Sequence, residues 1–179
     1  MYIKFAFLII LAIIAISLIR NTIAKYRSSG TSNANVDLAY YLFKEGSISQ
    51  DLKLASILPR TEKYNYTFSV ANNDGTKRTD TAIQYTISLK TTTNLPLNFR
   101  LYNQEDPTEN LISSMTTTAD TDGTYFRYIE AVGGNFGFSQ DEHRIYNLEV
   151  EFPTAFNSSD YEGIAEYVQI TINSSQKLN

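Results

Sequence analysis

The chain has 179 residues, which suggests a single folded domain, and its 42% hydrophobic and 19% charged residues are typical of a globular protein. The net charge is −4, and the part after residue 24 has 13 basic against 19 acidic residues, which disfavours nucleic acid as a partner. There is no cysteine, so disulfides, thiolate metal sites and a cysteine nucleophile are excluded.

Residues 1–24 form an apolar N-terminal segment. Lys4 precedes a run from Phe5 to Ile19 that contains a single polar residue, and Arg20 ends it. A run of this length matches the core of a signal peptide, about 7–15 residues, better than a membrane-spanning helix, which usually needs about 20. The sequence therefore predicts an N-terminal hydrophobic helix that is either a signal peptide or a short membrane anchor.

Processing after this run separates the two interpretations. Thr22 and Ala24 supply the small side chains that signal peptidase reads before its cut, and Lys25 would then begin the mature chain. An uncleaved anchor is the alternative, because Arg20 is atypical at the end of a signal-peptide core. A type IV pilin-like helix would need a processing site before the apolar run, and the sequence has none there. Both main interpretations place the rest of the chain outside the cytoplasm, secreted or at the cell surface.

A polar spacer, residues 25–35, precedes the first predicted strand, which extends from Val36 to Phe43. Side chains alternate along this strand with period two, as in a half-buried strand. Its buried face would consist of Val36, Leu38, Tyr40 and Leu42. The strand either completes its own sandwich or pairs with a neighbouring molecule, so we predict these four residues to form an assembly strand.

Eight further segments have the composition or the alternation of strands. The clearest places Tyr64, Tyr66, Phe68 and Val70 on one face. The eight segments are residues 50–58, 62–72, 81–91, 95–103, 124–132, 133–140, 143–153 and 167–173. Residues 104–123 are predicted to be a polar loop, and the glycines after residue 132 indicate a bulge or a sheet edge.

Short strands separated by turns, and an aromatic composition of 13 Tyr and 10 Phe, predict an all-β fold. We expect an antiparallel two-sheet sandwich, jelly-roll-like, over residues 36–174, with a tail at residues 175–179. Tyrosines on the apolar phase of strong strands belong to the core, whereas others would lie on the surface and could line a sugar-binding face. The predicted core tyrosines are Tyr64, Tyr66 and Tyr85, and the predicted surface tyrosines are Tyr41, Tyr102 and Tyr125.

No residue pattern indicates catalysis or a cofactor, and we predict that the protein is not an enzyme. His143 is the single histidine and is expected on the surface at a strand start. Asp120 and Asp122, followed by Gly123, match part of a calcium loop, but Thr124 breaks the pattern, and a turn explains the motif better. A second acidic group is expected to lie in a solvated loop and comprises Glu105, Asp106 and Glu109.

Four stretches resemble the TasA and camelysin group of exported fibre-forming proteins of Gram-positive (Firmicutes) bacteria. They are "RNTIAKY", "SSGTSNANVDLAYY", "DLKLASILPRTEKYNYTFSVANND" and "TTTNLPLNFRLY". The resemblance implies a jelly-roll sandwich, cleavage after Ala24 by a dedicated signal peptidase, and self-association through the freed N-terminal strand. This chain departs from the group's pattern in two ways. It has Arg60 where the group usually has Gly after the turn proline. It also lacks the segment rich in Phe and Asp/Thr that follows the cleavage site in the group.

Two functions are therefore expected from the sequence. The first is a non-enzymatic exported structural protein of the cell surface or biofilm matrix, with signal peptidase and further copies of the chain, as a homo-oligomer or fibre, as partners. The second is a binding module for glycan or protein, tethered to the membrane by an uncleaved N-terminal helix.

Overall fold

The computed structural model describes residues 34–42, 46–54 and 57–177, with the backbone alone for residues 34–38 and 53. All of these belong to one compact unit, Asn33–Asn179. The predicted hydrophobic helix, the polar spacer as far as residue 33, and the processing residues Thr22, Ala24 and Lys25 lie outside the described residues.

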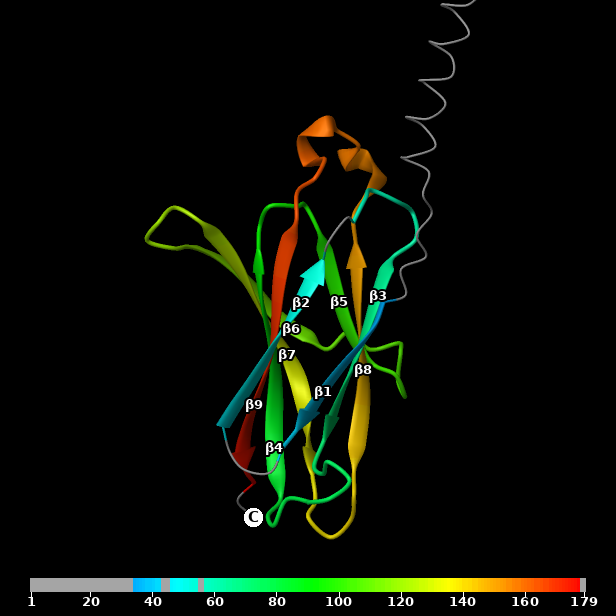
Figure 1. The fold of residues 1–179 in the computed structure, drawn as a ribbon, viewed down its shortest axis with the longest axis vertical. Helices are drawn as coiled ribbons and strands as arrows, with labels where there is room; N and C mark the ends of the chain where they lie inside the picture. The colour runs from blue at the N-terminus through cyan, green and yellow to red at the C-terminus, as the bar shows by residue number, and fades with distance from the viewer. Residues whose placement is uncertain (1–33, 43–45, 55–56, 178–179) are drawn as a thin grey trace, which may run out of the picture. The chain divides into compact units, whose positions relative to one another are not determined.

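Within the described residues nine strands form two sheets, as a two-layer all-β prediction requires (Figure 1). The four-stranded sheet contains β1 (Ala34–Tyr41), β3 (Tyr64–Ala71), β8 (His143–Glu151) and β5 (Asn98–Asn103), in that order. The five-stranded sheet contains β2 (Gly46–Leu54), β9 (Glu166–Gln176), β4 (Ile83–Thr92), β7 (Tyr125–Phe136) and β6 (Ile112–Ala119), in that order. Two 3-10 turns, η1 (Thr154–Phe156) and η2 (Ser159–Tyr161), join β8 to β9.

The first five strands alternate between the sheets, and the last two, β8 and β9, each return to lie between two of them. β8 pairs with both β3 and β5, and β9 pairs with both β2 and β4. The sandwich is therefore closed by strands that are far apart in sequence. β1 begins at Ala34 and β9 ends at Gln176, each two residues beyond the domain limits expected from the sequence.

One strand pair differs from the antiparallel prediction. β1 and β3 are parallel, whereas all other paired strands in the described part of the chain are antiparallel. The chain reverses direction on passing to β2 in the opposite sheet and again on returning to β3. β1 and β3 consequently run the same way, and β1 lies at the edge of its sheet.

The prediction for residues 104–140 is wrong in two places. Residues 112–119 form the strand β6 rather than a loop, and residues 125–136 form one strand, β7, rather than two. Of the two alternatives predicted for the glycines, a bulge is confirmed and a sheet edge is not, because the β4–β7 register shifts between Tyr85 and Ile87, opposite Gly133, and β7 lies between β4 and β6. A side chain at Gly133 would overlap the backbone carbonyl of Tyr85, so the close approach of the two strands requires glycine there.

The core lies between the sheets and follows the predicted alternation. On β3 and β4 every second residue is buried, including the expected core tyrosines Tyr64, Tyr66 and Tyr85. β8 continues this pattern beside β3, and β9 continues it beside β4 in the opposite sheet, with Leu148 and Ile170 fully buried. Burying these apolar faces against each other is what holds the two sheets together.

Candidate assembly strand and binding face

The predicted assembly strand contributes directly to the core. Tyr40 and Leu42 are both fully buried, whereas Tyr41 between them is 44% exposed. The Tyr40 hydroxyl donates a hydrogen bond of 3.2 Å to the carbonyl oxygen of Ile170 on the opposite sheet. The predicted burial is thus confirmed for Tyr40 and Leu42. Val36 and Leu38 lie in β1, where only the backbone is described.

Among the described strands, β1 pairs with β3 alone. Its last backbone contact is a hydrogen bond from the Leu42 N–H to the Ala71 carbonyl, at 2.8 Å. A further hydrogen bond of 3.0 Å joins the Gln50 side chain on β2 to the Ala39 carbonyl. β1 is therefore a peripheral strand by its hydrogen bonding and a core strand by its side chains. Its removal would open the edge of β3 and leave a cavity where Tyr40 and Leu42 were.

A series of aromatic contacts connects β1 to the rest of the sandwich. The ring of Tyr40 meets Phe68 edge-on at 5.8 Å, and Phe68 stacks on Tyr146 at 5.4 Å between ring centroids. Tyr146 reaches Tyr85 on the other sheet through their hydroxyl groups, and Tyr85 stacks on Phe136 at 5.1 Å. Aromatic pairs of this geometry stabilise by about 0.5–1.5 kcal/mol beyond simple burial. The fit of β1 thus depends on side chains from both sheets.

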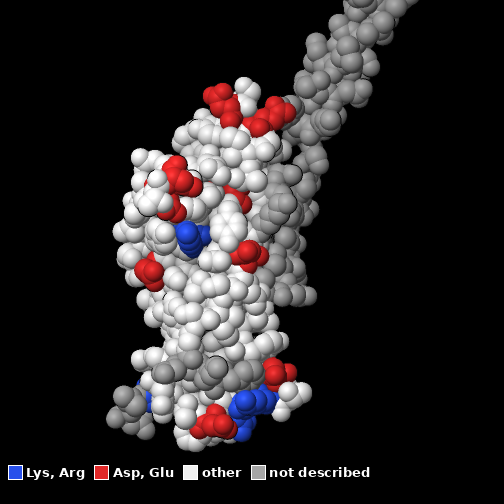
Figure 2. All heavy atoms as spheres, turned by 60° about the vertical axis from the view of Figure 1, so that its left-hand side comes forward, with Lys and Arg blue, Asp and Glu red and all other residues white. Residues whose placement is uncertain are grey.

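The outer face of the five-stranded sheet is polar and connected by hydrogen bonds between strands. Ser47 donates to the amide oxygen of Asn173 at 2.6 Å, and Ser49 and Thr171 share a hydrogen bond of 2.8 Å. Asp51 accepts hydrogen bonds from Tyr167 and Gln169, and these bonds lower the pKa of its carboxyl group. Figure 2, which brings forward the left-hand side of Figure 1, shows that most of the surface on that side is uncharged.

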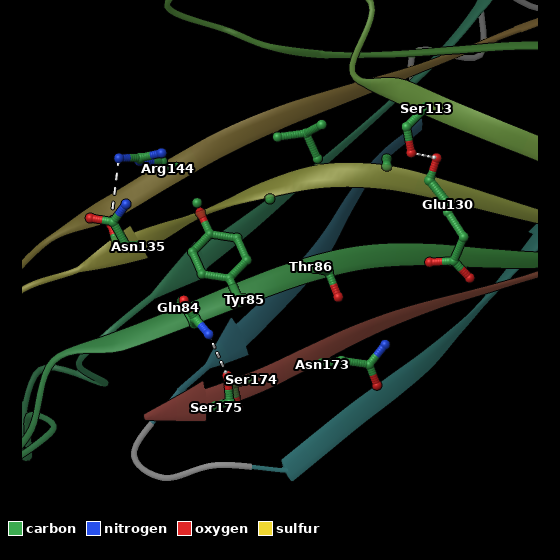
Figure 3. A pocket seen from close by; sticks show the side chains of 14 residues that line it. Gln84, Tyr85, Thr86, Ser113, Glu130, Asn135, Arg144, Asn173, Ser174 and Ser175 are labelled. Carbon is green, nitrogen blue, oxygen red and sulfur yellow. Dashed lines mark hydrogen bonds between the residues drawn. The ribbon is translucent and has the colours of Figure 1, made fainter. Parts of the chain in front are cut away.

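A hollow of about 820 Å³ opens on this outer face, next to the bulge of β7 (Figure 3). Its walls carry amides and hydroxyls from neighbouring strands, with one acidic and one basic side chain. The polar side chains around it are Gln84, Thr86, Ser113, Glu130, Asn135, Arg144, Asn173, Ser174 and Ser175. The hollow is open to solvent and lined by many hydrogen-bond donors and acceptors, so it suits a hydroxylated ligand better than an apolar one.

Within the hollow, most polar groups already have a protein partner. The Gln84 amide donates to Ser175 at 3.1 Å, and the Ser113 hydroxyl donates to the Glu130 carbonyl at 3.0 Å. Glu130 is the one acidic side chain among those that line the hollow (Figure 3). This carboxylate is exposed and could accept a hydrogen bond from a ligand hydroxyl.

Two partly exposed tyrosines lie on the same outer face, on strands beside the hollow. Tyr128 on β7 is 39% exposed and Tyr167 on β9 is 38% exposed. The Lys90 ammonium group lies 3.9 Å from the centroid of the Phe126 ring and 5.7 Å from that of Tyr128. Neither Tyr128 nor Tyr167 is among the surface tyrosines predicted from the sequence. Both lie on the polar phase of their strands, which is the signal that could have identified them.

The other residues singled out in the sequence lie apart from this face or in turns. His143 is exposed at the first position of β8, as expected. Tyr41 and Tyr125 are exposed, and Tyr102 is partly exposed. The predicted solvated loop is confirmed, because its three acidic residues, Glu105, Asp106 and Glu109, are all exposed.

Asp120 and Asp122 lie in the turn between β6 and β7, as the preferred interpretation of "ADTDG" requires. The Asp120 carboxylate accepts a hydrogen bond from the Thr121 N–H at 2.7 Å, and Asp122 accepts one from the Thr124 N–H at 2.9 Å. The bond to Thr124 lowers the pKa of Asp122. Gly123 has a positive φ of 86°, which this tight turn needs. In the described part of the chain, no three acidic or histidine side chains are grouped closely enough to bind a metal ion.

Arg60, which stands where the TasA and camelysin group usually has glycine, makes several contacts. Its guanidinium group lies 3.5 Å from the centroid of the Tyr64 ring, and its Nε donates to the Glu62 carbonyl at 2.8 Å. Its backbone N–H donates to the Phe152 carbonyl at 3.0 Å. The turn after the proline therefore accommodates a large side chain.

None of the helices in the described residues has the length and apolar character needed to span a membrane.

No protein-family model matches the chain, and no curated protein matches it. Among solved structures it is similar to the pre-peptidase C-terminal domain of a collagenase from Bacillus anthracis. The sequence identity is 12%, the match covers 79% of this chain and 100% of that one, and the TM-score is 0.29. A TM-score this low supports no conclusion about fold family or function.

Proposed function

We propose that this protein is a non-enzymatic, exported structural subunit of the cell surface or matrix that assembles by exchanging β1 between neighbouring copies. The observation that carries the proposal is that β1 is an edge strand by its hydrogen bonds and a core strand by its side chains. β1 is an edge strand that pairs with one neighbour, yet Tyr40 on it and Leu42 directly after it are fully buried in the core. An edge strand of this kind can leave its own domain only if an equivalent strand takes its place.

Exchange supplies that replacement. The β1 strand of one copy would add to the β3 edge of the next, with its backbone making the same ladder and its side chains entering the same core positions. Because the interactions that β1 makes within its own copy would all form again between copies, the exchange costs little enthalpy. Each copy both donates and accepts a strand, so the interface is head-to-tail and continues into a fibre if it does not close into a ring.

The fine topology supports the same proposal. The return of β8 and β9 between earlier strands matches the paired Greek keys of a jelly roll, with β6 moved to the other sheet and β1 added at the edge. A jelly roll is complete without an added edge strand, so β1 would be the element that joins copies. This interpretation agrees with the resemblance to the TasA and camelysin group.

Processing would control the exchange. Cleavage after Ala24 would free the spacer, residues 25–35, and allow β1 to reach a neighbour. If the cut did not occur, the same spacer would hold the domain at the membrane. Signal peptidase is therefore the first partner in this proposal, and N-terminal sequencing of the native protein tests whether Lys25 is the first residue.

Assembly itself is tested with residues 25–179 by electron microscopy and size-exclusion chromatography. We expect concentration-dependent fibres, and their loss when residues 36–43 are deleted. Because that deletion could prevent folding, a second variant is needed. Ala39 and Ser69 are register partners on β1 and β3, and the chain has no other cysteine, so Ala39→Cys with Ser69→Cys would lock β1 within its own copy.

The locked variant should stay monomeric when oxidised and assemble when reduced, which separates exchange from misfolding. The wild-type protein remaining a monomer at every concentration would contradict the proposal. Fibres that form equally well from the oxidised variant would also contradict it, because they would require an interface that does not involve release of β1.

A membrane-tethered glycan-binding module is the second candidate, and the hollow beside the β7 bulge favours it. The hollow offers amides, hydroxyls and the Glu130 carboxylate, and Tyr128 lies on the same face of β7. Binding on a glycan array that is lost in Tyr128→Ala and Glu130→Gln, and kept in Tyr41→Ala on the other sheet, would support this function. Equal binding by all three variants, or none by the wild type, would reject it.

A further inference from the structure

β6 is an edge strand that is exposed on both of its faces. Residues Ser113–Ala119 are all exposed, and only Ile112 at its start is partly covered. Within the described residues, β6 pairs with β7 alone, so alternate N–H and C=O groups along its outer side point away from the sheet. Figure 1 shows that the β6–β7 hairpin projects away from the rest of the sandwich. Such an edge is a template for pairing with another strand.

The four edge strands differ in how they are protected from such pairing. β1 contains Asp37, β2 contains Asp51 and Lys53, and the short β5 contains Arg100. Charged residues on an edge are a common defence against edge-to-edge association. Among the edge strands of the described residues, β6, with the sequence "ISSMTTTA", alone has no charge, and it contains no proline. Its hydroxyl-bearing and β-branched residues instead favour strand pairing.

Large apolar side chains are exposed on β6 and on the neighbouring strand β7. Met115 on β6 is 46% exposed, and Tyr125, Tyr128 and Val132 on β7 are 56%, 39% and 56% exposed. These are four of the eight large hydrophobic side chains on the exposed surface of the described residues, and they lie on two adjacent strands. Met115 is the register partner of Ile129 and Thr116 is that of Tyr128, so Met115 and Tyr128 lie on opposite faces of the hairpin. The unpaired backbone of β6, rather than a single apolar patch, therefore marks this edge for pairing.

We propose that β6 pairs with β6 of a second copy, antiparallel and about a two-fold axis at Met115, to join two five-stranded sheets. In this register Met115 lies opposite the partner's Met115, and Ser114 lies opposite the partner's Thr116. Of the remaining pairs, Ser113 lies opposite the Thr117 position of the second copy, and Ile112 lies opposite the Thr118 position. Thr–Thr and Thr–Ser pairs stabilise a sheet by about 0.2–1 kcal/mol each, and no like charges oppose each other.

This β6–β6 interface is independent of β1 exchange. It uses the five-stranded sheet, whereas β1 and β3 belong to the four-stranded one. A pairing of one strand with one strand is small, so a single interface would be weak. Many such interfaces between two fibres would act together by multivalency, so the β6 edge would hold neighbouring fibres side by side. The dimer should nevertheless form in protein that cannot exchange β1.

Cysteine cross-linking tests the register directly, because the chain contains no cysteine of its own. The full chain is purified in mild detergent with Met115→Cys or with Thr117→Cys. Both positions are exposed and lie on the same face of β6. Across the proposed axis, two cysteines at 115 would be adjacent, whereas two at 117 would be about 14 Å apart along the strands. We expect disulfide dimers from Met115→Cys and few from Thr117→Cys.

A charge exchange provides the second test. Ser114→Lys with Thr116→Lys places lysine opposite lysine at two points and should abolish the dimer in sedimentation velocity. Ser114→Lys with Thr116→Glu places each lysine opposite a glutamate of the other copy and should restore it. Because both positions are exposed, these variants should fold alike, as circular dichroism would verify.

Three outcomes would overturn the proposal. Equal cross-linking at positions 115 and 117 would exclude this register, and a dimer that persists with two lysines would place the interface elsewhere. Failure of the lysine–glutamate pair to associate better than the two lysines would exclude antiparallel self-pairing. Loss of this dimer would leave fibre formation by β1 exchange intact, so the two proposals fail separately.

Discussion

The hydroxyl oxygens of Tyr85 and Tyr146 lie 2.7 Å apart in the core, where they join the two sheets. Both side chains are buried, and this burial raises the pKa of each hydroxyl. One hydroxyl donates to the other, and the Arg144 side chain is a further hydrogen-bond partner of both, so these buried hydroxyls form a small polar group in the core. The pair therefore fixes how the two sheets sit against each other.

A double-mutant cycle on this pair tests that interpretation. Tyr85→Phe and Tyr146→Phe should each lower the free energy of unfolding by about 1–2 kcal/mol, because each removes the hydrogen bond between the two buried hydroxyls. The double variant should lose less than the sum of the two, with a coupling of about 1 kcal/mol measured by urea denaturation. Strict additivity would mean that the hydroxyls do not interact.

The strand β1 should show its dual character in stability measurements. Leu42→Ala should lower the free energy of unfolding by about 2–5 kcal/mol, because Leu42 is fully buried and the truncation leaves a cavity. Tyr41→Ala, one residue away and 44% exposed, should change it by less than about 0.5 kcal/mol. Thermal and urea unfolding of the two variants would distinguish a core strand from a loosely attached one, for which both changes would be equally small.

Asn72, directly after β3, should be intolerant of substitution. Its side chain donates to the carbonyls of Gly137 and Gln140 at 3.0 and 2.9 Å and accepts the N–H of Glu142 at 2.8 Å. The residue is fully buried, so Asn72→Ala would leave these groups unpaired and cost about 3 kcal/mol. Asn72→Asp should also destabilise, because a carboxylate would face two carbonyl oxygens. Unfolding curves close to wild type for both variants would refute this role.

Glu166 gives the fold a pH dependence. It is 2% exposed and accepts hydrogen bonds from the Thr91 hydroxyl at 2.7 Å and the Leu95 N–H at 3.0 Å. Burial raises its pKa above the ordinary value of 4.5, and these hydrogen bonds offset the effect only in part. The folded state therefore holds this proton more tightly than the unfolded state does. Its contribution to stability is complete below pH 4.5 and decreases as the pH rises through that value toward the folded pKa.

The variant Glu166→Gln removes this titration and is the matched comparison. The free energy of unfolding of the wild type relative to Glu166→Gln should fall as the pH is raised from well below 4.5 to neutrality. The total change should be about 1.4 kcal/mol for each pKa unit that separates the folded and unfolded states. Urea denaturation across this pH range measures the difference, and a relative stability that rises with pH would contradict the assignment.

Much of the fold is predictable from the sequence because most strands bury one face. Strict alternation of apolar residues on β3, β4 and β8 identifies both the strands and the residues that face the core. β6 has no buried face, so its Ser and Thr residues show no alternation and resemble a loop. β7 continues past Gly133 because a bulge accommodates it, and the glycines suggest an interruption where the strand only shifts register.

The candidate sites were predictable to different degrees for the same reason. Burial of Tyr40 and Leu42 follows from alternation along one strand, but the parallel direction of β1 depends on the path of β2 between the sheets. The hollow is made by side chains from neighbouring strands and by the bulge between Tyr85 and Ile87. In the sequence its polar residues resemble ordinary solvent-facing positions of strands. The sequence does not reveal the register between distant strands, so it could not show that these residues lie side by side.

The central claim, exchange of β1 between copies, is tested most directly by mixing two single-cysteine proteins. One carries Ala39→Cys on β1 and the other carries Ser69→Cys, its register partner on β3. A disulfide between these two proteins can form only if β1 of one copy lies beside β3 of another. Ser88→Cys, also partly exposed but on the other sheet, replaces Ser69→Cys in the control mixture. We predict cross-linked heterodimers in the first mixture and none in the control. Absence of the Ala39–Ser69 cross-link under conditions where the protein forms fibres would contradict the account.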